Sequence, residues 1–203
     1  MTRDVGRLHV ITDTILQHRF NASELAMMAA RGGTDVVQYR DKQQIPTQQR
    51  IDTTKAMLHW GVHVIVNDHV DVACVAHGVH VGAEDVSAEN ARMILGSEKI
   101  VGCTINNIAM ARNALRWPVD YVGVGPVFPT RSKDRPAPVL GLDGLHEIAS
   151  MLPFPVIAIG GIGPEHIADV LAAGAYGVAV LSSVVCADDP EKATRACREA
   201  IDR

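Results

Sequence analysis

The sequence predicts an α/β protein with a TIM-type (β/α)8 barrel, formed as a single domain over residues 1–203. Short runs of β-branched residues alternate about eight times with amphipathic segments, and the connections between them are short. Such alternation predicts parallel strands, because each crossover helix packs on a face of the sheet. A parallel sheet of eight such strands closes naturally into a barrel. A doubly wound open sheet is the alternative, but no GxGxxG motif follows the first predicted strand.

The individual elements follow from local patterns. The predicted strands are Leu8–Thr12, Asp35–Tyr39, His63–Asn67, Gly78–Val81, Ile100–Thr104, Asp120–Gly125, Val156–Ile159 and Gly177–Leu181. The predicted helices are Ala22–Arg31, Thr47–Trp60, Val70–Ala76, Ala88–Leu95, Ile108–Arg116, Leu142–Met151, Glu165–Ala173 and Pro190–Ile201. Pro164 and Pro190 stand where the first turn of a helix tolerates proline. Gly33, Gly61 and Gly174 fall just past predicted helix ends, where a left-handed residue is favoured.

Composition narrows the class of protein. Hydrophobic residues make up 47% and aromatic residues 4%, which predicts a large aliphatic core. The net charge of −4 argues against a nucleic-acid partner. No apolar run approaches the ~18 residues needed to cross a membrane, and the first residues are charged, unlike a signal peptide. The 4 cysteines form no CxxC pair, as is typical of reduced thiols. We expect a cytoplasmic protein that binds no nucleic acid and no membrane.

Polar residues gather where the predicted strands end, and in a barrel these ends meet at one mouth. Gln38, Arg40 and Lys42 follow the second strand at alternate positions, so their side chains share a direction. Arginine binds phosphate oxygens in bidentate fashion and lysine acts as a point charge. The three residues are therefore candidates to bind a diphosphate. The alternative is a solvated strand end that carries charges.

Acidic residues follow the next two strands. Asn67 and Asp68 end the third strand, and Glu84 and Asp85 follow the fourth. Magnesium binds through one or two carboxylates together with substrate phosphates, so Asp68 and Asp85 are the candidate Mg²⁺ ligands. Helix N-capping is the competing interpretation for each aspartate, because a predicted helix begins shortly after it.

The longest stretch without periodicity is Pro126–Leu140, which follows the sixth strand and so lies at the mouth. Its Thr130, Ser132 and Lys133 are candidates to contact an anion, and a mobile surface loop is the alternative. The segments after strands seven and eight contain Gly160-Gly161 and Leu181-Ser182. Loops at these two positions often bind phosphate in this fold.

Other reactive residue types give weaker signals. The 9 histidines form no HExxH motif. His80 is expected to be a hydrogen-bonded histidine of the barrel core, and His18 either touches a ligand or is solvated. Cys103 lies in an apolar strand, where an inert buried thiol is expected.

Taken in order, the motifs resemble the thiamine phosphate synthase family. They are Gln38–Lys42, Val66–Asp68, Gly78–Asp85, Gly123–Lys133 and Ala158–Ile162, and the likeness runs from Leu8 to Val184. The resemblance implies a TIM-barrel transferase with Mg²⁺ as cofactor and small phosphorylated molecules as partners. An aminomethylpyrimidine diphosphate would lose pyrophosphate by dissociation, and the nitrogen of a hydroxyethylthiazole phosphate would capture the pyrimidine cation. A homodimer is compatible with the sequence, which does not set the oligomeric state.

The resemblance also implies roles for individual residues. The diphosphate would be bound by Gln38, Arg40, Lys42, Asn67 and Lys133. Mg²⁺ would be bound by Asp68 and Asp85. The residues beside the reacting groups would be Thr104, Thr130 and Ser132, and the thiazole phosphate would be bound by Gly161, Leu181 and Ser182. Lys133, Arg40 and Thr104 are the candidate catalytic residues. Thr104 stands where the family usually has serine, and Ser132 where it usually has threonine.

Two further functions fit the same fold. The thiazole tautomerases form a sister family that isomerises the thiazole precursor and usually lacks the full Pro-Thr-x-Ser/Thr-Lys stretch found here at Pro129–Lys133. A barrel that binds ligands without catalysis is the second alternative, and the presence of both the cations and the carboxylates argues against it.

The first testable prediction concerns Lys133. A cation beside the departing pyrophosphate stabilises charge that grows toward the transition state, so its removal acts mainly on turnover. We expect Lys133→Ala to lower the coupling rate on the order of 10²–10³-fold, by analogy with the loss of an oxyanion-hole donor. Folding should be unaffected, since a surface lysine contributes little to stability. Paired assays of coupling and of thiazole isomerisation test this, and a variant that couples at the wild-type rate would contradict it.

Overall fold

The computed structural model describes residues 4–130, 132 and 137–203. Its strands form one closed parallel barrel in the order of the chain. Their bounds are β1 Leu8–Ile11, β2 Val36–Tyr39, β3 His63–Asn67, β4 Gly78–Val81, β5 Ile100–Ile105, β6 Tyr121–Val124, β7 Val156–Ile159 and β8 Gly177–Val180. Pairing of β1 with β8, which places Leu8 opposite Val178, closes the ring. The predicted (β/α)8 barrel is confirmed, and the open-sheet alternative is wrong.

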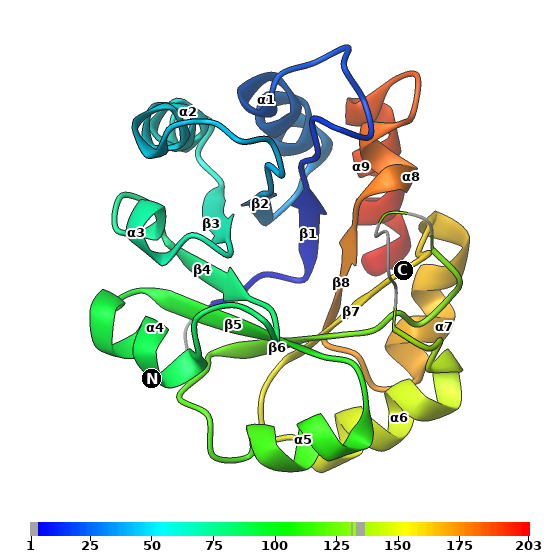
Figure 1. Cartoon of the computed structure of the whole chain (residues 1–203). Coiled ribbons are helices and arrows are strands. Elements are labelled where there is room, and N and C mark those ends of the chain that lie inside the picture. Colours follow the sequence, from blue (N-terminus) through cyan, green and yellow to red (C-terminus); the bar gives the residue numbers. More distant parts are fainter. Residues whose placement is uncertain (1–3, 131, 133–136) are drawn as a thin grey trace.

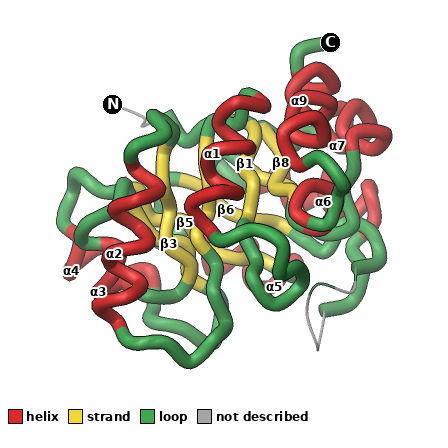
Figure 2. The backbone as a smooth tube through the Cα atoms, turned by 90° about the horizontal axis from the view of Figure 1, so that it is seen from above, coloured by secondary structure: helices red, strands yellow, loops and turns green. Residues whose placement is uncertain are grey.

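Helices surround the strands (Figures 1 and 2). They are α1 Ala22–Gly32, α2 Thr47–Leu58, α3 Val70–Ala73, α4 Ala88–Leu95, α5 Ile108–Ala114, α6 Gly141–Met151, α7 Ile167–Ala172, α8 Ser182–Val185 and α9 Pro190–Ile201, with a 3₁₀ turn at Pro164–His166 before α7. Within the described part of the chain, no helix is long and apolar enough to cross a membrane.

Each predicted helix is present, and the differences lie at element ends and in short helices. The segment predicted as Thr47–Trp60 ends at Leu58, and α7 begins with the 3₁₀ turn. The helix predicted as Val70–Ala76 is the four-residue α3, and the sequence analysis missed α8, whose four residues follow almost directly on β8.

The core has two layers because each strand is buried on both faces. Outward-facing residues such as Val10 and Val37 pack beneath the helices. Inward-facing residues such as Ile11, Ile65 and Ile157 fill the barrel. Tyr121 also points inward, and its ring occupies the space beside Gly102, where an added Cβ would lie 2.2 Å from a ring carbon. The barrel interior is therefore filled by side chains of the described residues, as is usual for this fold.

His9 is a buried titratable group in this interior. Its Nε2 lies 2.7 Å from the carbonyl oxygen of Val5, which only accepts, so Nε2 carries the proton and donates. Its Nδ1 has no hydrogen-bond partner among the described residues. Burial lowers the pKa of His9 from 6.5 to about 4, so the folded protein resists protonation of this ring.

This leads to a prediction about stability and pH. Folding lowers the pKa of His9. The stability that neutral His9 contributes is therefore fully present above about pH 6.5 and is lost as the pH falls toward 4. A shift of this size corresponds to about 3 kcal/mol. Urea unfolding between pH 4.5 and 8 should therefore show a smaller acid-induced loss of stability for His9→Phe than for the wild-type protein. The exposed His18, changed to Gln, is the matched control. An unchanged pH dependence in His9→Phe would contradict this assignment.

Candidate active site

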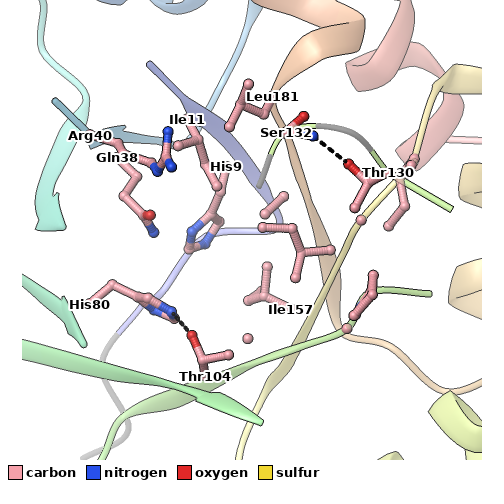
Figure 3. Close-up of a pocket in the computed structure, with 18 of the residues that line it drawn as sticks. His9, Ile11, Gln38, Arg40, His80, Thr104, Thr130, Ser132, Ile157 and Leu181 are labelled. Carbon is pink, nitrogen blue, oxygen red and sulfur yellow. Dashed lines mark hydrogen bonds between the residues drawn. The ribbon is translucent and has the colours of Figure 1, made fainter. Parts of the chain in front are cut away.

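A cavity of about 270 Å³ opens at the carboxyl ends of the strands (Figure 3). All eight strands contribute to its lining. The residues that line it include His9, Ile11, Gln38, Arg40, Asn67, His80, Thr104, Tyr121, Gly123, Thr130, Ser132, Ile157, Ile159, Gly161, Ala179, Leu181 and Ser182. This is the face on which enzymes of this fold carry their active sites.

The floor of the cavity combines aliphatic and aromatic side chains. Ile11, Ile157 and Ala179 belong to the buried cluster inside the barrel. The Tyr121 ring packs edge-on against His9 with ring centroids 5.3 Å apart, and lies 5.5 Å from the His80 ring. An apolar surface of this kind, with a few polar groups, suits a flat heteroaromatic ligand.

Arg40 lies at one side of the mouth and is held by Asp13. The guanidinium forms an ion pair with the Asp13 carboxylate, which is almost fully buried. The same carboxylate accepts hydrogen bonds from the backbone N–H groups of Ile15, at 2.9 Å, and Leu16, at 3.0 Å. Asp13 thus fixes both the loop after β1 and the cation that directly follows β2. The sequence analysis missed Asp13, although its position directly after the first strand is a signal that it lies at the mouth.

Lys42, Asp68 and Asp85 form a second charged cluster beside the cavity. The Lys42 ammonium donates to Asp68 at 2.5 Å. The Asp85 carboxylate accepts from the Gly82 N–H at 2.8 Å. Desolvation, together with a hydrogen bond and charge repulsion from Asp68, raises the pKa of Asp85. The two carboxylates therefore lie close enough to disfavour ionising together.

This cluster fits a divalent cation better than it fits helix capping. The N-cap of α3 is His69 and that of α4 is Ser87, so the N-cap interpretation is wrong for both aspartates. Asp68 adopts a positive φ of 66°, which is uncommon outside glycine and concentrates at functional sites. No group of three or more histidine, cysteine or acidic residues is placed to bind a metal within the described residues. A bound Mg²⁺ would therefore need substrate or water oxygens in addition to Asp68 and Asp85.

The opposite side of the mouth is built from the ends of β6, β7 and β8. Gly161 has a φ of +66°, and an added Cβ would lie 2.5 Å from the Pro129 carbonyl oxygen, so this backbone packs closely on the loop after β6. Ser182 is the first residue of α8, where backbone N–H groups lack partners within the helix. Thr130 accepts a hydrogen bond from the Ser132 N–H at 3.2 Å.

Most of the predicted site residues come together. The ones that line the cavity are Gln38, Arg40, Asn67, Thr104, Thr130, Ser132, Gly161, Leu181 and Ser182. Lys42, Asp68 and Asp85 lie in the adjoining charged cluster, and Lys133 lies outside the described residues.

Of the other reactive residues, His80 and Cys103 are buried and His18 is exposed. His80 is buried and hydrogen-bonded as expected, and it also lines the cavity. His18 is exposed and does not line the cavity. Cys103 is buried as expected, and burial raises the pKa of its thiol to about 12, which disfavours the reactive thiolate. His9 and Tyr121 were missed, although the alternation of His9 with Ile11 along β1 is a signal that both point inward.

The fold and the site define a class of protein. A (β/α)8 barrel whose mouth combines cations, carboxylates and closely packed glycine backbone is typical of enzymes that act on phosphorylated small molecules. A profile of the family described as thiamine monophosphate synthase matches residues 8–184. The chain belongs to this family.

Individual relatives agree with this assignment. A thiamine-phosphate synthase from Salinibacter ruber is 42% identical, and the alignment covers 98% of this chain and 90% of the relative. The structure of thiamine phosphate pyrophosphorylase from Pyrococcus furiosus is 35% identical, with a TM-score of 0.87 and coverage of 97% and 95% of the two chains. A geranylgeranylglyceryl phosphate synthase from Thermoplasma acidophilum has a TM-score of 0.73 at 15% identity, over 98% of this chain and 94% of that one, which indicates a shared fold only.

The charged cluster generates a prediction about metal binding. Asp85→Asn should weaken binding of Mn²⁺, used as a probe for Mg²⁺ in the presence of pyrophosphate, and lower turnover more than about tenfold, because a ligand charge is lost. Asp68→Asn should act in the same direction. Glu84→Gln, at the exposed neighbouring position, is the matched control. Calorimetry measures the binding, and full activity of both aspartate variants in the presence of a chelator would contradict the metal assignment.

Proposed function

We propose that this chain is a thiamine-phosphate synthase that joins an aminomethylpyrimidine diphosphate to a hydroxyethylthiazole phosphate and releases pyrophosphate, with Mg²⁺ as cofactor. The observation that carries the proposal is the arrangement of the cavity, in which an apolar floor lies between two polar sides. Figure 3 shows Gln38 and Arg40 on one side of the cavity and Thr130 and Ser132 on the other. Two phosphorylated substrates that react at a methylene carbon attached to one ring and at a nitrogen of the other ring need such an arrangement.

The pyrimidine half would occupy the floor and the charged side. Its ring would lie on the aliphatic and aromatic side chains, and its diphosphate would extend toward Arg40, Lys42 and Asn67. Arg40 can bind two phosphate oxygens while Asp13 keeps its guanidinium in place. Gln38 is buried at the base of this side and can bind the ring or the first phosphate.

The reaction is proposed to be dissociative. The bond between the methylene carbon and the diphosphate oxygen breaks, pyrophosphate leaves with the bonding electrons, and the thiazole nitrogen donates its lone pair to the pyrimidine cation. Mg²⁺ bound at Asp68 and Asp85 would stabilise the negative charge on the leaving group. No cysteine or lysine lines the cavity within the described residues, so a covalent enzyme intermediate is not part of the proposal. The apolar floor keeps water away from the cation, which favours capture by thiazole.

The thiazole half would occupy the side formed by β6, β7 and β8. Its phosphate would bind the backbone near Gly161, Leu181 and Ser182, where glycine permits close approach and N–H groups at the start of α8 are available. Thr130 and Ser132 would contact the region between the two substrates. Lys133 is proposed to reach the leaving pyrophosphate, on the strength of the sequence motif alone.

We also propose the domain organisation and the cellular location of the enzyme. The closed barrel, in which β1 pairs with β8, supports a single domain over the whole chain. All four cysteines are free, which supports the reducing cytoplasm as the location. The names of the relatives favour the synthase and lend no support to the tautomerase or to a non-catalytic barrel.

The test is a coupling assay with both precursors and Mg²⁺. We expect thiamine phosphate and pyrophosphate in equal amounts, and none when either precursor is omitted. Arg40→Gln should lower the rate on the order of 10²-fold or more, because a charged donor to the leaving group is lost. Arg116 is an exposed arginine in the connection between α5 and β6 and does not line the cavity, so Arg116→Gln should couple normally. Isomerisation of a thiazole carboxylate without coupling would establish the tautomerase instead.

A further inference from the structure

Arg50 is a buried cation that the proposed reaction does not use. It lies in the first turn of α2, is 9% exposed and does not line the cavity. Its guanidinium donates to two backbone carbonyl oxygens, from Nη1 to Ile45 and from Nη2 to Gln43, the latter at 2.6 Å. Among the described residues, no carboxylate forms an ion pair with it, and its Nε has no hydrogen-bond partner. A buried charge without a counter-ion is costly, so a particular task is expected of this residue.

The two carbonyls belong to the segment that follows β2 and carries Lys42. Residues 41–46 form neither strand nor helix, so side chains supply much of the hydrogen bonding of their backbone. The Gln43 N–H donates to the Asp41 carboxylate at 2.9 Å. The Gln43 carbonyl accepts from the guanidinium and, at 3.1 Å, from the Ile45 N–H. Both backbone groups of the residue after Lys42 therefore have partners that fix them.

The geometry of this contact requires arginine. A guanidinium is a planar fork whose two terminal nitrogens bind two acceptors at once, whereas a lysine ammonium is a point charge on a flexible stem. Here the acceptors are the carbonyls of Gln43 and Ile45, which lie in one irregular segment. The fork stands on α2, so the segment is tied to a helix and not to another loop. The course of the chain just after Lys42 therefore depends on Arg50.

The two cations that follow β2 thus have separate anchors. Arg40 is held at its guanidinium by Asp13, in the loop after β1. Lys42 forms an ion pair with Asp68 at 2.5 Å, but its long side chain is 47% exposed. The position of its backbone therefore decides where the ammonium can reach, and Arg50 sets that position.

We propose that Arg50 is a positioning residue, which fixes the segment after β2 so that the Lys42 ammonium lies beside Asp68 and within reach of the substrate diphosphate. The inference rests on the proposed function, because that function supplies the diphosphate. Arg50 itself touches no substrate. Without its two hydrogen bonds the segment gains conformational freedom, and the cost of ordering it on binding lowers the affinity for the diphosphate.

A double-mutant cycle tests the proposal, with the dissociation constant of pyrophosphate measured by calorimetry in the presence of Mg²⁺. Arg50→Met removes the guanidinium and keeps an unbranched stem. We expect about fivefold weaker binding, in the range of a lost hydrogen bond. Arg50→Met should have no further effect in a Lys42→Ala protein, because Arg50 acts through Lys42, and should keep its full effect in an Arg40→Gln protein. Equal losses in both backgrounds would overturn the proposal.

A second variant separates positioning from the loss of charge. Arg50→Lys keeps the charge and loses the fork, so its affinity should be close to that of Arg50→Met, and wild-type affinity would contradict the proposal. KM for the pyrimidine substrate should rise in parallel, whereas KM for the thiazole substrate should stay unchanged, since a general loss of structure would raise both. If Arg50→Met does not fold, Arg50→Lys takes its place in the cycle.

Arg195→Met is the matched control. Arg195 lies on α9, outside the cavity lining, and also donates to a backbone carbonyl, that of Arg31. Its replacement removes one positive charge from the chain and should leave the dissociation constant unchanged. A wild-type protein that binds no pyrophosphate in Mg²⁺ would refute the diphosphate site and the role of Arg50 together. Equal losses in the two backgrounds would overturn the role of Arg50 and leave the proposed function intact.

Discussion

Opposite charges pair at the mouth of this barrel, and the rest of the site depends on that pairing. Arg40 is partly buried and would be costly to desolvate alone, so the buried Asp13 carboxylate holds it in place. Lys42 pairs with Asp68 on the adjoining strand end. The strand order creates these pairs, because it sets the ends of β1, β2, β3 and β4 side by side.

Under the proposed function, the pairing would allow one mouth to bind both a cation and an anion. A diphosphate would add negative charge beside Asp68 and Asp85, where desolvation already disfavours a second ionised carboxylate. A divalent cation held by the carboxylates would remove that repulsion, and Arg40 and Lys42 would take up the remaining phosphate charge. The apolar floor next to them, filled by Ile11, Ile157 and Tyr121, strengthens these interactions because it excludes water.

The sequence predicted the strands, every described α-helix except α8 and most of the cavity lining, because each has a local signal. Alternating apolar residues mark strands, and polar residues at strand ends mark the mouth. The four-residue helix α8 has no such signal. His9, Tyr121 and Asp13 were missed because their roles arise from contacts across the barrel, such as the approach of the His9 and Tyr121 rings from β1 and β6. Likewise, the N-cap interpretation of Asp68 and Asp85 could be tested only against the actual N-caps, His69 and Ser87.

The central claim is that the carboxylate pair and the cations form one site in which Mg²⁺ and the diphosphate group support each other's binding. The most direct measurement is calorimetric titration of the wild-type protein with pyrophosphate, with and without Mg²⁺, and the reverse titration with and without pyrophosphate. Thermodynamic linkage requires the two enhancement factors to be equal, and we expect each to be at least about tenfold. Equal affinity for pyrophosphate in Mg²⁺ and in chelator would contradict the account.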